Sequence, residues 1–441
     1  MDLRHYRFLP DKEMLRNIIK LISCISIGLV IGCKEKGTVE SEAFSVELET
    51  IAKGNEKEFT WTHARSAVIP SDSPKVITTM SQTLKKGSDV YHDLFQIESQ
   101  DRGGTWTSPE VIPSLTIIKQ DSGYRSLVDM WPQWHSNTKK VVNIGTSPFY
   151  SNAKTHDGWK KKVVYAYLDA ETEQWSAPQF LELPKLDHDG MLLMAPAAGS
   201  AQWLELLNGD ILLPIFYFKV TEEQASLAMT NPDEAFSIGN LMKSDDFGFS
   251  TTIVRCSFDG KNLIYKEHGD ELILKQGRGI YEPSITFFKG EYFLTMRSDK
   301  SAYVSKSKDG LHFSPPKEWT FDDGAVLGSY NTQQHWVSHS DALYLVYTRR
   351  GANNDEVFRH RAPLFMAEVD SDKLEVIRDS ERIVVPNRGV ALGNFGIMEV
   401  NQAETWITVA EYMRGEENVA ADNSVFTARI LWKRPNLNSK Q

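Results

Sequence analysis

The sequence has 441 residues, of which 41% are hydrophobic and 24% are charged, so the chain can bury a sizeable core and is not an intrinsically disordered protein. Its formal net charge is −10 and no basic block occurs, which argues against nucleic-acid binding, because that depends on Lys and Arg contacts to phosphates. An anionic ligand would therefore need a local basic pocket.

The first predicted element is a targeting segment. Arg16 and Lys20 precede an apolar run from Leu21 to Ile31, which ends at Gly32-Cys33 and is too short for a good membrane span. The letters LVIGC resemble a bacterial lipobox, which implies a signal peptide over residues 1–33 and an exported, membrane-anchored lipoprotein with lipid on Cys33. A plain signal peptide or a signal anchor is the alternative. Residues 34–57 are polar and low in aromatics, so we expect a tether there.

The cysteine count excludes two kinds of site. Cys24 and Cys33 lie in the targeting segment, which leaves Cys256 alone in the mature chain. We therefore expect no intramolecular disulfide and no cysteine-based metal site, with Cys256 as a small buried hydrophobe. No histidine-pair spacing or EF-hand-like loop indicates a metal, and no motif indicates a cofactor.

Short alternating or apolar runs fill the chain from residue 58 onward, separated by Gly, Asn, Asp, Ser and Pro. KVITTMSQ, which begins at Lys75, is one example, and WLELLNGDILLPIF carries the hairpin signal Asn208-Gly209 at its centre. No amphipathic helix of four turns is found. This pattern predicts an all-β protein.

A polar turn closed by an aromatic side chain recurs along these strands. Ser99 to Trp106 reads SQDRGGTW, in which Asp and Ser side chains can bond nearby backbone groups and Gly tolerates a positive φ. Degraded copies follow other strands, with their aspartates at Asp169, Asp259, Asp309 and Asp370. The spacing fits one four-stranded unit plus loops, which predicts roughly six blades of a β-propeller over residues 58–435. A pair of two-sheet sandwiches is the alternative.

These turns resemble the Asp-box of sialidases and related six-bladed propellers, and the resemblance spans most of residues 60–415. A more specific match is YEPSITFFKGEYFLTMRSDKSAYVSKSKDG, in which a glutamate begins one strand and an arginine ends the next. The resemblance implies that Glu282 polarises a catalytic tyrosine and that Arg297 is one of three arginines gripping a substrate carboxylate. Arginine suits that role because it stays charged and binds carboxylates in a planar, bidentate manner. The alternative is an exposed Glu and a surface Arg.

The resemblance also assigns residues outside this segment. HARSAVIP supplies a second arginine, Arg65, and GSDVYHDLF supplies Asp89 as the catalytic acid/base, unless Asp89 is only a solvated turn residue. The arginine-rich stretch before PLFMAEVD supplies the third, Arg361, with Arg359 in reserve. Glu411 corresponds to a glutamate that steadies the first arginine. At the place of the family's tyrosine nucleophile stand Asn394 and Phe395, so a retaining route through a tyrosyl intermediate would need a phenol from elsewhere, such as Tyr281, Tyr330 or Tyr412.

Aromatic and histidine side chains complete the candidate substrate-binding set. DMWPQWH contains Trp134 and His135, and QQHW contains His335. Aromatic rings suit stacking on sugar faces, while a histidine is either a base for elimination or an ordinary hydrogen-bonded residue.

The leading functional hypothesis is therefore an exo-acting glycoside hydrolase that releases a terminal acidic sugar, a sialic acid or a relative, from a glycan. A second is a polysaccharide lyase, in which arginine neutralises a uronate and His135 or a tyrosine removes a proton. A third is a non-catalytic, glycan-binding lipoprotein.

Overall fold

The chain folds almost entirely into β-strands, as the alternating pattern predicts. The computed structural model describes residues 39–54, 58–85, 89–151, 157–230, 248–415 and 419–438. Residues Thr38–Gln441 form one unit. Among the described residues, the helical elements are α2 (Glu222–Thr230) and three single 3-10 turns, η1 (Pro113–Leu115), η2 (Phe358–His360) and η3 (Arg378–Ser380). In the part of the chain that is described, no helix is long and apolar enough to cross a membrane.

The described strands form six antiparallel sheets. The first sheet contains β3 (Phe59–Ile69), β4 (Lys75–Leu84), β5 (Tyr91–Ser99) and β6 (Glu110–Val111). The second contains β7 (Ile118–Gln120), β8 (Gly123–Arg125), β9 (Val128–His135), β10 (Lys140–Tyr150), β11 (Asp157–Asp169), β12 (Gln174–Trp175) and β13 (Gln179–Phe180). The third contains β14 (Leu192–Ala197), β15 (Leu204–Glu205), β16 (Asp210–Val220), β17 (Phe249–Phe258) and β18 (Leu263–His268).

The remaining sheets come from the second half of the chain. The fourth contains β19 (Tyr281–Phe288), β20 (Glu291–Arg297), β21 (Ala302–Ser307) and β22 (Lys317–Glu318). The fifth contains β23 (His335–Ser338), β24 (Leu343–Tyr347), β25 (Leu364–Asp370), β26 (Glu375–Val376) and β27 (Arg382–Val385). The sixth contains β28 (Ala391–Leu392), β29 (Gly396–Asn401), β30 (Glu404–Tyr412) and β31 (Ser424–Trp432), joined by β1 (Val39–Glu40) and β2 (Phe44–Lys53).

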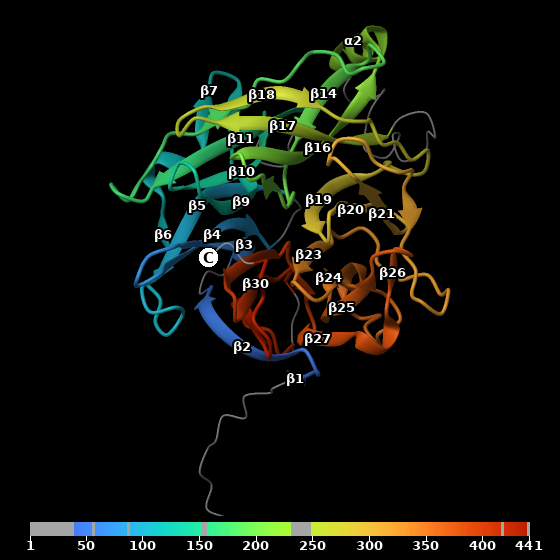
Figure 1. Cartoon of the computed structure of the whole chain (residues 1–441). Helices are drawn as coiled ribbons and strands as arrows, with labels where there is room; N and C mark the ends of the chain where they lie inside the picture. Colours follow the sequence, from blue (N-terminus) through green and yellow to red (C-terminus); the bar gives the residue numbers. More distant parts are fainter. Residues whose placement is uncertain are drawn as a thin grey trace, which may run out of the picture. The chain divides into compact units, whose positions relative to one another are not determined.

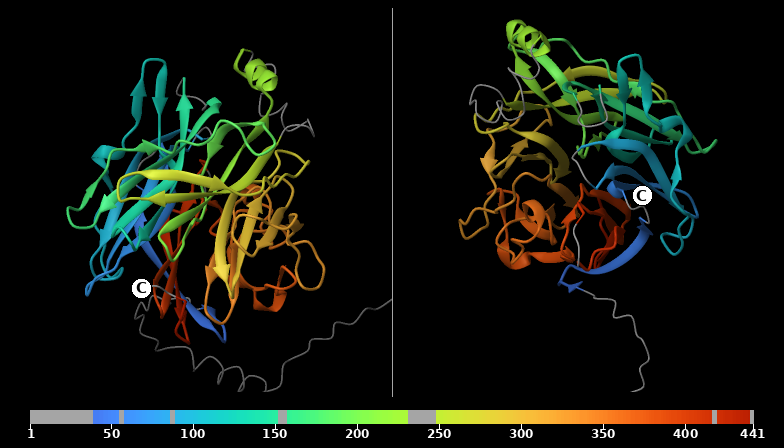
Figure 2. Two further views of the ribbon diagram at one scale, coloured as in Figure 1. Left: turned by 45° about the horizontal axis from the view of Figure 1, so that its top comes forward. Right: turned by 180° about the vertical axis from the view of Figure 1, so that it is seen from behind.

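The sheets follow one another in a propeller-like ring (Figures 1 and 2). Contacts run in order from β3 to β9, β11 to β14, β16 to β19, β19 to β23, β23 to β29, and from β29 back to β3. Apolar side chains fill the space between neighbouring sheets, as where Val68 and Val76 meet Met398 and Trp406. Cys256 is fully buried in such a layer, as expected. The closed order of contacts confirms the all-β ring and leaves no support for separate sandwiches.

The ring closes through a strand from the N-terminal side of the chain. β2 pairs with β31 from Phe44 opposite Trp432 to Lys53 opposite Ser424, and so lies beside the three C-terminal strands of the sixth sheet. Residues 44–53, which we expected in the tether over 34–57, are therefore a strand of the folded domain. The reason is visible in the burial of Phe44, Val46 and Ile51, whose apolar side chains face the core. Cys33 and the expected signal peptide lie outside the described residues.

The recurring polar turns join the third strand of a sheet to the strand that follows it. In the first, Asp101 accepts hydrogen bonds from the backbone nitrogen and the hydroxyl of Thr105, both at 2.8 Å, and Ser99 Oγ accepts one from Gly103 N at 2.7 Å. Gly103 has φ +88, and a Cβ there would lie 2.8 Å from the Trp406 ring. Trp106 packs on Trp406 of the neighbouring sheet, with ring centroids 6.2 Å apart. The equivalent turns, which also bond their own backbone, are those of Asp169, Asp259, Asp309 and Asp370.

Candidate functional site

Four of the inner strands of the ring, β3, β9, β14 and β19, carry a bulge. The bulged residues have positive φ without being glycine: His63 at 54°, Asp129 at 54°, Ala195 at 53° and Glu282 at 47°. Each coincides with a shift of register in its strand pair. A bulge re-aims a side chain, and strained backbone of this kind gathers at functional sites. Three of the four residues are titratable, and all three belong to the clusters described next.

Asn331, in the loop before β23, brings two of the predicted arginines together. Its side-chain oxygen accepts a hydrogen bond from Arg297 at 2.6 Å and its backbone oxygen accepts one from Arg361 at 2.7 Å. Arg297, at the end of β20, also forms an ion pair with Glu282 at the start of β19. The resemblance assigns Glu282 and Arg297 to one site without pairing them, and Asn331 carries no signal in the sequence. One backbone loop therefore fixes two guanidiniums beside one carboxylate.

Tyr281 lies between two arginines. The guanidinium carbons of Arg278 and Arg297 each lie 4.8 Å from the centroid of its ring, at the distance of cation–π contacts. Its hydroxyl donates to Asp299 Oδ1 at 2.8 Å, and Asp299 also pairs with Arg278 at 2.6 Å. Burial raises the pKa of Tyr281 to about 12, although both arginines lower it. Tyr281 is therefore a neutral side chain that separates and positions two cations.

Three cations around this centre have no carboxylate partner. Among the described residues, Lys161, Arg359 and Arg361 form no ion pair. Burial, together with the charges of Arg297 and Arg359, lowers the pKa of Arg361 to about 10. Burial also lowers the pKa of Lys161, and Glu282 and Asp89 lie near enough to raise it. Lys161, on β11, was not predicted as a site residue, because nothing in its local sequence distinguishes it from Lys160 and Lys162.

Asp129 holds a second cluster on β3 and β9. It forms an ion pair with the Nη2 atom of Arg65 at 3.4 Å, and its Oδ1 accepts hydrogen bonds from Ser200 at 2.5 Å and Asn394 at 2.7 Å. His63 lies 3.2 Å from the same oxygen, and burial lowers the pKa of His63 to about 4 despite the raising effect of Asp129. Neighbouring His63 and Arg65 hold the pKa of Asp129 well below its usual range, against the effect of burial.

Arg65 does not have the free guanidinium that we expected. It is 1% exposed, and its three nitrogens donate to Phe395 O at 3.0 Å, Met130 O at 3.2 Å and Ser200 Oγ at 2.9 Å. The guanidinium nitrogens of Arg65 are therefore already hydrogen-bonded to protein oxygens in the absence of a ligand. Arg65 therefore lies in the ring centre as expected, but its contacts are those of a residue that positions Asp129.

Asp89 lies ahead of β5, exposed, with φ +61. Its Oδ1 accepts a hydrogen bond from the Tyr91 hydroxyl at 3.2 Å, and its backbone oxygen accepts one from Tyr150 at 2.8 Å. Burial and the charge of Asp89 raise the pKa of Tyr412, which Arg361 and Arg359 lower in turn. Asp89, Tyr412 and the unpaired arginines are therefore close enough to influence one another.

Glu411 does not steady Arg65. Its Oε2 accepts hydrogen bonds from the backbone nitrogens of Asp422 at 3.0 Å and Ser424 at 2.9 Å, and its Oε1 lies 3.2 Å from Arg388. Burial raises the pKa of this carboxyl. Glu411 is placed one residue before the end of β30, where the opening of the β30–β31 hairpin presents backbone donors to it.

Three other expected site residues are packing residues. Trp134 packs against Ala67 and Ile77 between the first two sheets. His135 is fully buried at the far end of β9, with its two ring nitrogens 2.9 Å from Thr138 Oγ1 and 2.8 Å from Gly209 O. His335 is also fully buried, bonded to Ser284 at 2.7 Å, and burial holds its pKa well below the usual range. The sequence shows these rings near strand ends, but it does not show which face of the strand they occupy.

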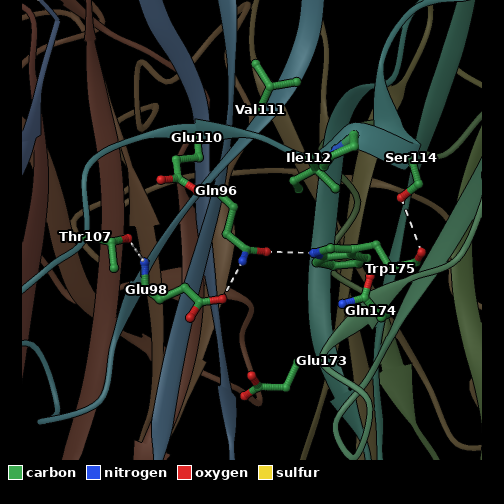
Figure 3. Close-up of a pocket in the computed structure, with 11 residues that line it drawn as sticks. Gln96, Glu98, Thr107, Glu110, Val111, Ile112, Ser114, Glu173, Gln174 and Trp175 are labelled. Carbon is green, nitrogen blue, oxygen red and sulfur yellow. Dashed lines mark hydrogen bonds between the residues drawn. The ribbon is translucent and has the colours of Figure 1, made fainter.

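A cavity lies away from these clusters, between the outer parts of the first two sheets. It has a volume of about 480 Å³, and Gln96 in its wall accepts a hydrogen bond from the Trp175 indole at 2.6 Å (Figure 3). Three carboxylates line it, those of Glu98, Glu110 and Glu173. Carboxylates repel an anion, so this cavity does not suit an acidic ligand. The cationic centre of the ring is the candidate functional site.

Comparison with known proteins yields structural relatives only. No protein-family model and no curated protein matches the sequence. A crystal structure of a protein of unknown function from Dyadobacter fermentans is 13% identical, with a TM-score of 0.59 over 88% of this chain and 99% of that one.

Two further solved structures that it resembles are sialidases. The Trypanosoma rangeli sialidase is 13% identical, with a TM-score of 0.55 over 89% of this chain and 58% of that one. The phage phi92 endosialidase is 11% identical, with a TM-score of 0.53 over 90% of this chain and 71% of that one. The chain thus spans little more than half of the trypanosomal enzyme. At these identities the likeness is one of fold, and the fold is sialidase-like.

Proposed function

We propose that the protein is an exo-acting glycoside hydrolase that releases a terminal acidic sugar, a sialic acid or a relative, and that its six sheets are the blades of a six-bladed propeller. The observation that carries the proposal is the group of unpaired cations, Lys161, Arg359 and Arg361, beside the Arg297–Glu282 pair. Like charges gathered in a buried place cost free energy unless an anion compensates them. A sugar carboxylate supplies that anion.

The roles follow from exposure and pairing. Arg297 and Arg361 bind the carboxylate. Arg359 lies at the exposed side of the carboxylate and takes the role that the resemblance gave to Arg65. Asp89 is the acid/base, because it is exposed and lies beside the arginines. Tyr412 is the phenol that we place nearest the reacting carbon, since Asp89, Arg361 and Arg359 all act on its pKa.

One observation favours a second function. Asn394 occupies the place expected of a tyrosine nucleophile, and its amide is bonded to Asp129 at 2.7 Å. An amide cannot be a nucleophile in this reaction, which favours a protein that binds acidic glycans without cleaving them. The lyase alternative with His135 as the base loses its support, because His135 is fully buried and hydrogen-bonded at both nitrogens.

Turnover and binding are measured on the same protein. The full chain is incubated with α-linked sialosides and with uronate-bearing polysaccharides, products are identified by mass spectrometry, and ligand affinity is measured by calorimetry. We expect release of free acidic sugar, lowered at least about tenfold in Arg361→Lys, because an ammonium cannot reproduce a bidentate fork. Arg378→Lys is the matched control, since Arg378 is paired with Asp323 at 2.6 Å elsewhere on the protein.

Each alternative has its own outcome. Affinity for acidic glycans without any product selects the binding protein, and an unsaturated product selects a lyase. If Arg361→Lys binds and cleaves acidic sugars as well as Arg378→Lys does, the carboxylate-binding role of Arg361 is wrong.

We further propose that the protein is exported and anchored to a membrane by lipid on Cys33. The support is the apolar run from Leu21 to Ile31 followed by Gly32-Cys33. Cys33→Ala should abolish incorporation of a labelled fatty acid, whereas Cys24→Ala should leave it. Continued labelling of Cys33→Ala would place the anchor elsewhere.

A further inference from the structure

A histidine–histidine–glutamate cluster lies away from the cationic centre, on the third sheet. His188 belongs to the link between β13 and β14, His268 ends β18, and Glu271 follows shortly after. One ligand atom from each lies within 4.8 Å of the other two. The expectation of no metal rested on sequence spacing, and 80 residues separate His188 from His268, so spacing alone could not find this group.

Two of the three distances in the cluster match the edges of a metal tetrahedron, and the third is within 4.8 Å. His268 Nε2 lies 3.2 Å from Glu271 Oε1, and His188 Nδ1 lies 3.4 Å from the same oxygen. Zinc binds imidazole nitrogen and carboxylate oxygen at about 2.0–2.1 Å, so two ligands of a tetrahedral zinc lie about 3.3 Å apart. We infer that His188, His268 and Glu271 form a binding site for Zn²⁺ or a similar transition-metal ion, with the fourth position open to water.

The surroundings of His268 suit a metal ligand. Its Nδ1 is 2.8 Å from the Tyr265 hydroxyl, which can accept a hydrogen bond from the Nδ1–H when Nε2 binds a metal. Binding moves the remaining ring proton to Nδ1 and places the metal between Nε2 and the carboxylate.

His188 is the adjustable ligand. Its ring stacks on that of His268, with centroids 4.0 Å apart and planes 8° apart. Lone pairs of imidazole lie in the ring plane, so one ring must turn before both nitrogens face one ion. His188 is free to do so, because its side chain is 57% exposed and the terminal torsion of histidine is soft.

The charged side chains next to His188 in sequence are paired with Lys219 and not with the three proposed ligands. Lys219 forms ion pairs with Asp187 at 3.1 Å and with Asp189, so both carboxylates that flank His188 in sequence are already neutralised. The three ligands mix imidazole with a single carboxylate, a set that suits Zn²⁺ and disfavours Ca²⁺, which takes oxygen ligands. A bound ion would clamp the link that enters the third sheet to the outermost strand of that sheet.

The test uses the full chain, freed of metal by chelation, in equilibrium dialysis against Zn²⁺. We expect one Zn²⁺ per chain, no competition from Ca²⁺, and visible absorption bands of a low-symmetry site when Co²⁺ replaces Zn²⁺. His188→Ala and Glu271→Gln should lower the affinity about tenfold or more. Both substitutions keep the buried His268, so the fold is preserved.

His312→Ala is the matched control, because His312 is exposed and forms a single histidine–carboxylate pair with Asp309 at 2.7 Å. Its affinity should equal that of the unchanged chain. The thermal midpoint should rise with Zn²⁺ in the unchanged chain and in His312→Ala, but not in His188→Ala. Failure of the unchanged chain to bind Zn²⁺, or binding that His188→Ala leaves intact, overturns the site. Neither result bears on sugar hydrolysis.

Discussion

Asp129 compensates the charge of the buried Arg65 guanidinium. Its carboxylate faces Arg65, which is 1% exposed, so each compensates the other away from water. Asp129→Asn keeps the shape and removes the charge. We expect the free energy of unfolding to fall by about 3–5 kcal/mol, because an unpaired guanidinium is left buried.

Chemical denaturation measures this loss. The control is Asp323→Asn, which breaks the more exposed pair with Arg378 and should lower the free energy of unfolding much less. Equal losses in the two variants would show that Arg65 does not depend on Asp129.

His63 gives the protein a pH dependence of stability. Its folded pKa is about 4, below the value of 6.5 for an exposed histidine, so the unfolded chain binds more protons between these values. Stability is therefore full above pH 6.5 and falls as the pH drops toward 4, by up to about 3 kcal/mol from this group. His63→Gln should flatten the curve of unfolding free energy against pH in that window. A His63→Gln curve parallel to that of the unchanged chain would contradict the assignment.

The sequence predicts one half of the candidate site better than the other. Glu282 and Arg297 lie in a single hairpin, so a local pattern contains both. Asp129 and Asn394 are 265 positions apart and meet only because the ring closes. Nothing local marks Asn331 either, since its role comes from backbone and side-chain oxygens placed between two guanidiniums.

At the scale of elements, the recurring polar turn was predictable because its bonds are local. Asp101 accepts from Thr105 and Ser99, all within a few positions. The burial of Trp134 and the pairing of Glu411 with Arg388 could not be predicted from the sequence. Both depend on contacts with residues that lie far away along the chain.

Asp101→Ala tests the turn as an element. It removes three hydrogen bonds to the Asp101 carboxylate, so we expect the protein to unfold at a lower temperature. Thermal unfolding measures it. Asp121→Ala, in the exposed turn between β7 and β8, is the control and should change little. If the two variants melt alike, the bonds of the Asp101 turn add no net stability.

At the scale of the whole molecule, the alternation of strands and the repeated turns predicted a ring, but not its closing strand. The segment from Phe44 to Lys53 is short of aromatics and was taken for a tether, although Phe44, Val46 and Ile51 mark one buried face. Its partner, β31, lies at the other end of the chain, and no local pattern shows such a pairing.

Truncation tests the closure. A chain that begins at residue 44 keeps β2, and a chain that begins at residue 55 lacks it. We expect the second to unfold at a clearly lower temperature and to associate, because the edge of β31 is then unpaired. The first is the matched control. Identical melting curves would mean that β2 adds nothing to the ring.

The pairing of β2 with β31 also sets an order of events during synthesis. A ribosome makes β2 long before β31, so β2 lacks its long partner strand until nearly the whole chain exists. Contacts between residues so far apart in sequence form slowly, because the ends must first find each other. The earlier sheets can pair within themselves while the chain is still growing. Joining the two ends is then the step that completes the protein, and a chaperone that shields one unpaired strand would speed it most.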